Sequence, residues 1–453
     1  MSRLRRSAII VYAALFVSAL FFLGMVTGVM LVRYEVQPGP WLDQAVTALR
    51  AWDEYLFDKV VARAGSKQRQ LVKLGLWQRE RTRDTGVLRN NPTLSFAGYT
   101  LYTSAHDQGA RLLDPDGRVV HEWQKSFAEI WPDGRHLAPT PRVDPEFLMW
   151  RHAYLYPNGD ILAVFEGLGV TPWGSGLAKL DRNSRVLWTF DDRVHHEVDV
   201  APDGRIAALT HALRDKPLGN LSFLQTPLVE DFVVILSPDG KRLGTWSLYE
   251  ALAASPWEVL LHLANPKEDR DYLHANTVKF VPAGFASANP PVEEGDLMIT
   301  LRETDTVCVL RPSSGEIVWA RRVPCEAPHH ATPLPNGNII IFDNGGRKSA
   351  DGFSRVIEFE PGTGRTVWCY QGSPGQVFYS RVRSGQQVLP NGNVLITESD
   401  AGRMIEVTRS GEIVWEWRTP HRGEAIGLPK AIPVICAGTR YSAEQLPFVA
   451  ETK

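Results

Sequence analysis

Two adjacent histidines, His329 and His330, precede a Pro-Asn-Gly turn and a strand-like Ile-Ile-Ile-Phe run in the stretch PHHATPLPNGNIIIFDNGG, residues 328–346. Imidazoles titrate close to neutral pH and serve proteins as nucleophiles, general acids or bases and metal ligands. Both His329 and His196 lie six residues before the proline of such a turn. This common spacing predicts that the two side chains reach the same level of a repeating structure.

Arg302, in LMITLRETDTV, bears on which chemistry these histidines would perform. A histidine cluster first suggests a transition metal, such as zinc held by three imidazoles. A guanidinium, however, is a poor neighbour for a divalent cation and a good one for a tetrahedral oxyanion. The sequence therefore favours a sulfate or phosphate site, with no metal and no cofactor. An ion pair of Arg302 with Glu303 or Asp305 on a solvated face is the alternative.

The elements that must position these residues repeat along the body of the chain. One unit is a turn followed by a strand ending in tryptophan; a second, alternating with it, is a strand, a Pro-Asn/Asp-Gly turn and another strand. Two hairpins per repeat give four antiparallel strands, so six repeats predict an all-β, six-bladed β-propeller rather than a sandwich. The six tryptophans are Trp123, Trp188, Trp246, Trp319, Trp368 and Trp415.

In such a blade the strand before the Pro-Asn-Gly turn is innermost, so the residues ahead of it lie near one mouth of the central channel. His274 precedes its turn proline by eight residues and is expected at this mouth. His152 precedes its own by five and is a weaker candidate. In the last blade Ser384 and Gly385 stand at this level.

The N-terminal stretch carries a different signal. Ala8 to Val32 are 25 uncharged residues preceded by three arginines, and at about 1.5 Å per residue they exceed the roughly 30 Å core of a bilayer. We expect a cytoplasmic stub and transmembrane anchor over residues 1–33. The arginines favour a cytoplasmic N-terminus and a single-pass inner-membrane protein whose C-terminal domain lies in the periplasm or outside the cell. A long cleavable signal peptide is the alternative.

The rest of the chain divides into an amphipathic juxtamembrane helix with a charged linker, residues 34–90, and the propeller with a C-terminal tail, residues 91–453. Lys plus Arg (49) nearly balance Asp plus Glu (51), which gives no reason to expect a nucleic-acid partner. No Cys-x-x-Cys spacing occurs, and four cysteines permit three disulfide pairings. They are Cys308, Cys325, Cys369 and Cys436.

Three stretches together resemble the bacterial aryl-sulfate sulfotransferases: HANTVKF from 274, ITLRETDTVCVL from 299, and HHATPLPNGNIIIFDNGG followed by SRVIEFEP. The resemblance covers residues 95–418 and is strongest over 272–360. It implies a six-bladed propeller that transfers a sulfuryl group from a phenolic sulfate ester to a phenol. It further implies a nucleotide-independent ping-pong reaction through a sulfohistidine. The known soluble members carry an N-terminal β-domain ahead of the propeller, whereas in this chain we expect an anchor, a helix and a charged linker there.

Roles for individual residues follow from this resemblance. It implies that His329 is the nucleophile, that His274 and Arg302 bind the sulfuryl oxygens and assist the leaving oxygen, and that His196 is a further imidazole of the site. A neutral imidazole can attack sulfur and yield an activated N-sulfonated intermediate, so the chemistry agrees. The expected substrate-binding residues are Asn276, His330 and Tyr379.

Some of these side chains have competing explanations. His330 is expected to bind substrate or only to orient its neighbour His329. The alternation of side chains along a strand favours the second, because it would turn His330 away from the channel. Phe378, Tyr379 and Trp173 lie in expected loops where they could stack on an aryl substrate or simply pack.

Two rival functions remain open. A quinone-cofactor propeller would share the Gly-x-x-x-Trp turns, but six blades are too few and the adjacent cysteine pair of those dehydrogenases is absent. A membrane-anchored, non-catalytic propeller that binds a protein or glycan explains everything except the phased histidines with Arg302.

Overall fold

The computed structural model describes residues 19, 21–27, 56–57, 59–138, 143–219, 221, 223–263, 270–345, 353–373 and 376–452. The chain divides into two compact units, residues 1–69 and 70–453. In the first, residues 21–27, 56–57 and 59–63 are helical, and the rest of both predicted N-terminal helices lies outside the described residues. No helix in the described ranges is long and apolar enough to cross a membrane.

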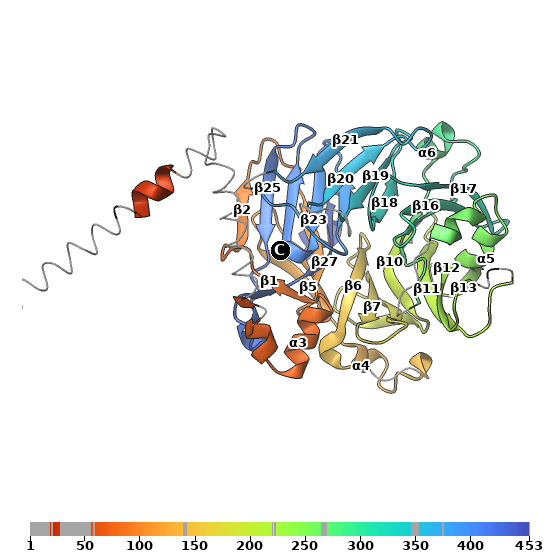
Figure 1. Cartoon of the computed structure of the whole chain (residues 1–453), viewed down its shortest axis with the longest axis horizontal. Helices are drawn as coiled ribbons and strands as arrows, with labels where there is room; N and C mark the ends of the chain where they lie inside the picture. The colour runs from red at the N-terminus through yellow and green to blue at the C-terminus, as the bar shows by residue number, and fades with distance from the viewer. Residues whose placement is uncertain are drawn as a thin grey trace, which may run out of the picture. The chain divides into compact units, whose positions relative to one another are not determined.

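The second unit is a six-bladed β-propeller, as predicted (Figure 1). Each blade is an antiparallel sheet whose strands follow one another from the channel outward. Blade 1 comprises β27 (Ile435–Tyr441), β3 (Tyr99–Ser104), β4 (Gly109–Leu113) and β5 (Val119–Gln124). Blade 2 comprises β6 (Leu148–Leu155), β7 (Ile161–Gly167), β8 (Gly174–Leu180) and β9 (Val186–Phe190). Blade 3 comprises β10 (Val194–Val200), β11 (Ile206–Arg214), β12 (Leu228–Leu236) and β13 (Arg242–Ser247).

The second half of the ring repeats this order. Blade 4 comprises β14 (Ala275–Phe280), β15 (Leu297–Leu301), β16 (Thr306–Arg311) and β17 (Glu316–Arg322). Blade 5 comprises β18 (His329–Pro333), β19 (Ile339–Asp343), β20 (Arg355–Phe359) and β21 (Thr366–Gln371). Blade 6 comprises β22 (Gly385–Val388), β23 (Val394–Glu398), β24 (Arg403–Val407) and β25 (Ile413–Arg418).

The ring closes through blade 1, where the C-terminal strand β27 pairs with β3 and becomes the innermost strand. The sequence contains six hairpins that end in tryptophan but only five strand-turn-strand units. The pairing of β27 with β3 explains the difference, because blade 1 has no such unit of its own. The sixth inner strand comes from the other end of the sequence and shares no turn with β3. The expected C-terminal tail therefore contains an essential part of the first blade.

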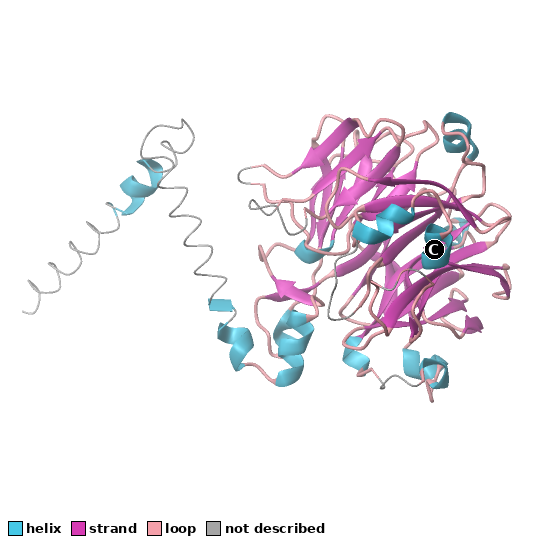
Figure 2. Cartoon of the chain, turned by 45° about the vertical axis from the view of Figure 1, so that its right-hand side comes forward, coloured by secondary structure: helices cyan, strands magenta, loops and turns pink. Residues whose placement is uncertain are grey.

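Residues ahead of position 91, where a charged linker was expected, also contribute strands. β1 (Trp77–Arg79) pairs with β26 (Ala431–Pro433), and β2 (Gly86–Asn90) adds a fifth, outermost strand to blade 6. The short helices lie in connections between strands, except for one that precedes the first strand, β1, and one that follows the last, β27 (Figure 2). The helices are α3 (Ser66–Lys73), α4 (Phe127–Ile130), α5 (Leu248–Ala253) and α6 (Ala283–Ala288), with 3-10 turns η1 (Arg135–Leu137), η2 (Pro145–Phe147), η3 (Glu258–Leu263), η4 (Ser399–Ala401), η5 (Gly423–Ile426) and η6 (Pro447–Thr452).

The repeated tryptophans fasten neighbouring blades. Each lies on the outermost of the four strands, and three of them donate an indole N–H to a turn carbonyl of the next blade, so one side chain satisfies a polar group and covers apolar surface. These hydrogen bonds run from Trp123 to Gly159 O (3.0 Å), from Trp368 to Arg409 O (2.9 Å) and from Trp415 to Pro115 O (3.0 Å).

The Pro-Asn-Gly turns return each inner strand into the next. Gly337 has a φ of 88°, a left-handed conformation that glycine adopts without a steric cost. A Cβ at this position would lie 2.5 Å from the Cβ of Ala288. Both backbone conformation and space therefore require glycine at this turn.

Candidate active site

A β-bulge at one level of the inner strands positions the candidate residues. The strand register shifts at this level in β6, β10, β14, β18 and β27. A bulge adds a residue to one strand and re-aims its side chains, so two consecutive residues can face the same side. His196 and His330 have left-handed φ values of 56° and 58° at these bulges.

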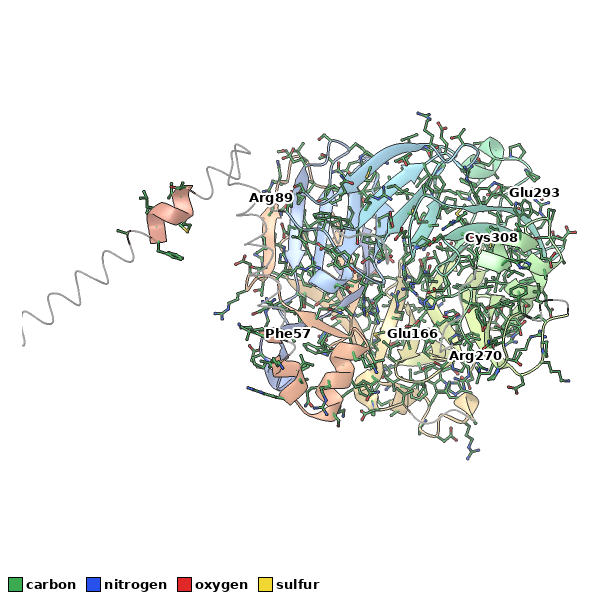
Figure 3. All side chains as sticks on the ribbon, viewed as in Figure 1. Phe57, Arg89, Glu166, Arg270, Glu293 and Cys308 are labelled. Atoms are coloured by element: carbon green, nitrogen blue, oxygen red, sulfur yellow. The ribbon has the colours of Figure 1, made fainter. Side chains whose placement is uncertain are left out.

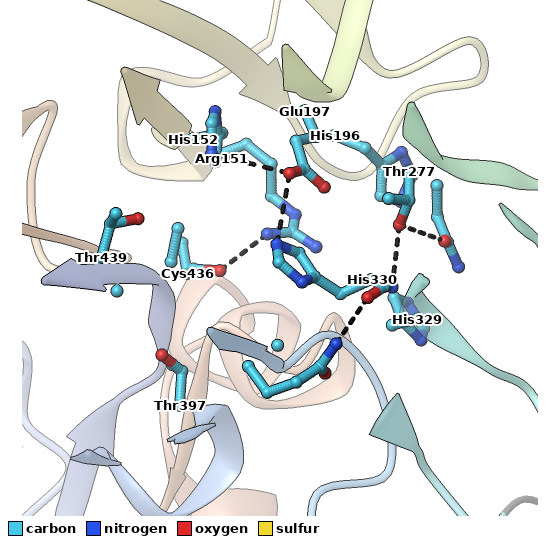
Figure 4. Close-up of a pocket in the computed structure, with 15 residues that line it drawn as sticks. Arg151, His152, His196, Glu197, Thr277, His329, His330, Thr397, Cys436 and Thr439 are labelled. Atoms are coloured by element: carbon cyan, nitrogen blue, oxygen red, sulfur yellow. Dashed lines mark hydrogen bonds and ion pairs between the residues drawn. The ribbon is translucent and has the colours of Figure 1, made fainter. Parts of the chain in front are cut away.

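Consecutive residues from all six inner strands line a cavity of about 30 Å³ on the propeller axis (Figure 4). Such a volume accommodates a water molecule or two, and polar groups surround it. It brings together four of the sequence-predicted residues, His196, Asn276, His329 and His330. The pairs are Arg151 and His152, His196 and Glu197, Asn276 and Thr277, His329 and His330, Gly385 and Gln386, and Cys436 and Ala437.

His329 is held in one tautomer. Its Nδ1 lies 2.7 Å from Asn344 Oδ1 and 3.1 Å from Ala327 O, and both partners are acceptors. The orientation of the Asn344 amide is fixed, because its Nδ2 donates to the carbonyls of Ser380 and Arg383. The Nδ1 of His329 must therefore carry the proton, and in the neutral ring Nε2 keeps its lone pair.

The surroundings keep this imidazole neutral. His329 is 3 % exposed, and burial holds its pKa well below the usual value, with Arg302, Arg151 and His274 lowering it further. A neutral ring with a free Nε2 lone pair is the nucleophilic form of histidine.

His274 and Asp271 form a carboxylate-imidazole pair just ahead of β14. The Nδ1 of His274 hydrogen-bonds Asp271 Oδ2, and the Asp271 Oδ1 accepts from the His274 backbone N–H at 3.0 Å. Its ring centroid lies 5.2 Å from that of Trp173 and 5.0 Å from that of His196. Since Asp271 orients Nδ1, Nε2 is the atom available to exchange protons with a ligand.

Arg302 lies in the turn between β15 and β16, and its backbone N–H donates to His274 O at 3.2 Å. Its Nη1 forms an ion pair with Glu303, one of the two pairings that the sequence offered as an alternative. Its buried Nε has no hydrogen-bond partner within the described ranges. The guanidinium therefore keeps a donor for a ligand while Glu303 fixes its orientation.

His196 belongs to a larger buried histidine cluster. Its Nδ1 lies 2.8 Å from Nδ1 of His195, and its backbone N–H donates to Glu166 Oε1. His195 stacks on His211 with ring centroids 4.2 Å apart. Burial lowers the pKa of His195 to about 3 and holds those of His196 and His211 well below normal.

This cluster contains the described groups that come closest to a metal site: Glu166 with His195 and His196, and His195 with His211 and Asp231. In the second group the Nε2 of His211 accepts from Gly174 N–H at 2.8 Å. Its neutral ring therefore carries a proton on Nδ1, which leaves it no free lone pair for a metal ion. In the first group the two imidazoles bond each other, so this cluster is better described as a hydrogen-bonded support for His196.

His330 faces the cavity beside His329, because the bulge overrides the strand alternation that would have turned it away. Its Nε2 lies 3.2 Å from Glu197 Oε1, which also forms an ion pair with the half-buried Lys279. Burial alone would raise the pKa of Glu197, but His330 and Lys279 lower it below its usual value. His152 lines the same cavity with its Nε2 3.9 Å from Glu197.

The remaining predicted residues occupy different places. Asn276 donates to Pro328 O at 2.8 Å and so ties β14 to the segment ahead of His329. Trp173 contacts His274 and His196, whereas Phe378 is fully buried in the core. Tyr379 is not among the residues that line the cavity; its backbone is held by Glu398 and Arg81.

Arg151, Asp271 and Asn344 are among the polar residues that sequence reasoning missed. Arg151 lies six residues before Pro157, the spacing that selected His196 and His329, so the signal was present but was applied only to histidines. Asp271 and Asn344 support imidazoles from loops outside the repeat and carry no such spacing. In Figure 3, Glu166 lies toward the middle of the propeller, whereas Glu293 lies at its outer edge.

The fold and the site together define a six-bladed β-propeller with imidazoles and guanidiniums gathered at one end of its axis. The sequence model of the arylsulfotransferase (ASST) family matches residues 152–420, more than half of the chain. The chain therefore belongs to the arylsulfotransferase family, as its resemblance implied. This membership supports an arylsulfotransferase-type function with aryl sulfates and phenols as substrates.

No curated protein matches the chain. Among solved structures, a Bacteroides caccae protein of unknown function is 12% identical over 75% of this chain and 99% of its own, with a TM-score of 0.45. A streptogramin B lyase is 12% identical over 81% of this chain and 97% of its own, with a TM-score of 0.40. A virginiamycin B lyase from Staphylococcus aureus is 11% identical over 59% and 69%, with a TM-score of 0.33.

Proposed function

We propose that the protein transfers a sulfuryl group from an aryl sulfate to a phenol in two steps, through a sulfohistidine at His329. The observation that carries the proposal is the arrangement of this ring: Nδ1 donates to Asn344 and Ala327, so the neutral imidazole presents the lone pair of Nε2. The family match supports the substrate class. Neither step calls for a nucleotide donor or a cofactor.

In the first step Nε2 of His329 attacks sulfur while the bond from sulfur to the aryl oxygen breaks. The electron pair stays on that oxygen, and the His274 imidazolium donates a proton from Nε2 to give the phenol. Asp271 stabilises the cationic ring before transfer. The sulfonated His329 ring keeps its Nδ1 proton and is cationic, so the acceptors Asn344 Oδ1 and Ala327 O stabilise it.

In the second step the neutral His274 removes the proton of an incoming phenol, whose oxygen attacks sulfur. The bond from sulfur to Nε2 of His329 breaks, and its electron pair returns to the ring. One group thus serves as acid and then as base, as a symmetric exchange between two phenols requires. Arg302 supplies a donor to the sulfuryl oxygens in both steps.

His196 and Asn276 complete the site. His196 lies against His274 and keeps a low pKa through burial, so it offers a neutral ring to the substrate. Asn276 positions the segment ahead of His329 through its bond to Pro328 O. Tyr379 would contact only the outer part of a larger substrate, since it lies outside the cavity lining.

We further infer a single-pass inner-membrane protein with its propeller on the periplasmic side. The arginines ahead of residues 8–32 support this orientation. Protease treatment of spheroplasts should degrade the propeller, and full protection would argue against the orientation.

The experiment uses the full chain with p-nitrophenyl sulfate, with and without excess phenol. We expect nitrophenolate release that depends on phenol and falls by at least about a hundredfold in His329→Ala and in Arg302→Ala, since each removes a group that acts on the transition state. His262→Ala, which alters a ring stacked on Phe223, is the matched control and should keep wild-type activity.

Mass spectrometry of acid-free digests, made after donor alone is added, should find a sulfuryl adduct on the peptide that contains His329. Release without an adduct would remove the covalent intermediate from the proposal. A folded wild-type protein that is inactive with several aryl sulfates would contradict the function and favour a non-catalytic binding propeller.

A further inference from the structure

Arg151 occupies the position in blade 2 that His196 occupies in blade 3 and His329 in blade 5. Each of these residues lies four positions before the last residue of its inner strand, which ends at Leu155, Val200 or Pro333. In a ring of six, blade 2 lies opposite blade 5. Arg151 and His329 therefore face one axial cavity from opposite sides, as Figure 4 shows.

The guanidinium of Arg151 is buried but incompletely bonded. The residue is 7% exposed, and its Nη1 donates to Cys436 O at 2.7 Å. Its Nε forms an ion pair with Glu166 Oε2 at 3.7 Å, which is too long for a hydrogen bond. No hydrogen bond from Nη2 occurs among the described residues. Since buried donors are normally hydrogen-bonded, this open donor next to a cavity points to a ligand with negatively charged acceptor oxygens.

The orientation of His329 directs a bound group toward Arg151. Nδ1 of His329 points into its own blade, at Asn344 and Ala327 O. Nε2 is on the opposite side of the ring from these two acceptors, and His329 lines the cavity. Both Arg302 and Arg151 are close enough to lower the pKa of His329. A group attached to Nε2 would thus lie between two guanidiniums.

We propose that Arg151 is a second sulfuryl-binding arginine, whose Nη2 donates to a non-bridging oxygen of the group on Nε2 of His329. The inference rests on the proposed function and adds a catalytic residue to it. Arg302 would hold the group from the mouth and Arg151 from within the channel. A planar guanidinium matches two oxygens of a tetrahedral sulfuryl group better than an ammonium does.

The test compares the full chain with Arg151→Met and Arg151→Lys. Arg440→Lys is the matched control, because Arg440 is also buried but is bonded to Thr100, Phe96 O and Glu406 and does not line the cavity. We expect kcat to fall roughly a hundredfold in Arg151→Met and less in Arg151→Lys, the scale for loss of one oxyanion donor. Calorimetry with inorganic sulfate should show binding at least about tenfold weaker in Arg151→Met.

A pH profile separates this role from a structural one. Arg151 lowers the pKa of His329, so its removal should move the acidic limb of the kcat/KM profile to higher pH. A loss of packing alone would lower the melting temperature without moving that limb. If Arg151→Met does not fold, the partial losses of kcat and sulfate affinity expected in Arg151→Lys still test the proposal.

A failure of the role proposed for Arg151 can be distinguished from a failure of the proposed function. Unchanged kcat and sulfate affinity in a folded Arg151 variant, with an active wild type, would overturn this inference alone. A wild type that binds sulfate through Arg151 yet transfers nothing would overturn the proposed function and leave the anion site.

Discussion

At the scale of single residues, burial decides the protonation of the site. His152, His195, His196, His211 and His329 all lie in the interior, and burial lowers the pKa of each below its usual value, to about 3 for His152 and His195. Removing an imidazole from water disfavours its charged form. The cluster is therefore a set of neutral rings, and hydrogen bonds determine which nitrogen of each ring carries the proton.

These depressed pKa values predict that the protein loses stability in mild acid. Below about pH 6.5 the unfolded chain binds protons that the folded chain excludes, so each such histidine lowers the free energy of unfolding by about 1.4 kcal/mol per pH unit. Chemical denaturation at pH 7.5, 6.5 and 5.5 should show a steep fall that begins near pH 6.5. The depressed pKa of Glu197 contributes only at lower pH, below the ordinary range of a glutamate.

The matched variant is His211→Gln, whose amide can still accept the Gly174 N–H. It should reduce the dependence of the free energy of unfolding on pH by about 1.4 kcal/mol per pH unit, the contribution of one proton. A free energy of unfolding that stays level between pH 6.5 and 5.5 would show that the folded protein takes up these protons.

At the scale of elements, the bulge in the inner strand is the feature that brings additional side chains to the channel. Regular alternation would bring one residue per blade to the channel, whereas the bulge brings two. His329 and His330 are the example, and Glu197 beside His196 is another. The same device explains why neighbours in sequence line the cavity in the blades whose inner strand is bulged, whereas β22 contributes Gly385 and Gln386 without a register shift.

The sequence predicted the repeat, the inner position of the strand before each Pro-Asn-Gly turn, and the convergence of His196 and His329. It could do so because turn residues and apolar alternation are local. The bulge at His330 was unpredictable, since a left-handed φ such as its 58° is uncommon for residues other than glycine and leaves no periodic signal in the sequence. The pairing of Asp271 with His274 and of Asn344 with His329 depends on loop conformation, which leaves no periodic trace.

Gly385 tests how tightly the bulge level is packed. A Cβ at Gly385 would lie 3.0 Å from Cγ of His330 and 3.1 Å from its Cδ2, so Gly385→Ala must displace that imidazole. We expect transfer activity to fall about tenfold or more, because small displacements near the reacting atoms are costly, with a stability loss of about 1–3 kcal/mol. Steady-state kinetics and chemical denaturation would measure both.

The control for this substitution is Gly362→Ala, in an outer turn where nothing lies within 4 Å of an added Cβ. It should change neither quantity appreciably. If Gly385→Ala were as active as Gly362→Ala, His330 would have no positional role in the reaction.

At the scale of the whole molecule, the two ends of the propeller sequence meet in one blade. β27 pairs with β3, and the carbonyl of Cys436, a residue of β27, accepts the hydrogen bond of Arg151. Blade closure and the site therefore share the same strand. A ring of sheets has no free inner edge only while this strand is in place.

Deleting residues 435–453 should therefore destabilise the propeller far more than the length of the deleted segment suggests. β3 would lose its inner partner and expose a row of unpaired N–H and C=O groups, and Phe448, packed near Trp123, would be lost as well. We expect a large loss of soluble protein and of cooperative thermal unfolding, measured by calorimetry. Deletion of residues 450–453 alone keeps β27 and Phe448 and should unfold as the full chain does. A 435–453 deletion that melts cooperatively at the wild-type temperature would mean that the remaining blades close the ring without β27.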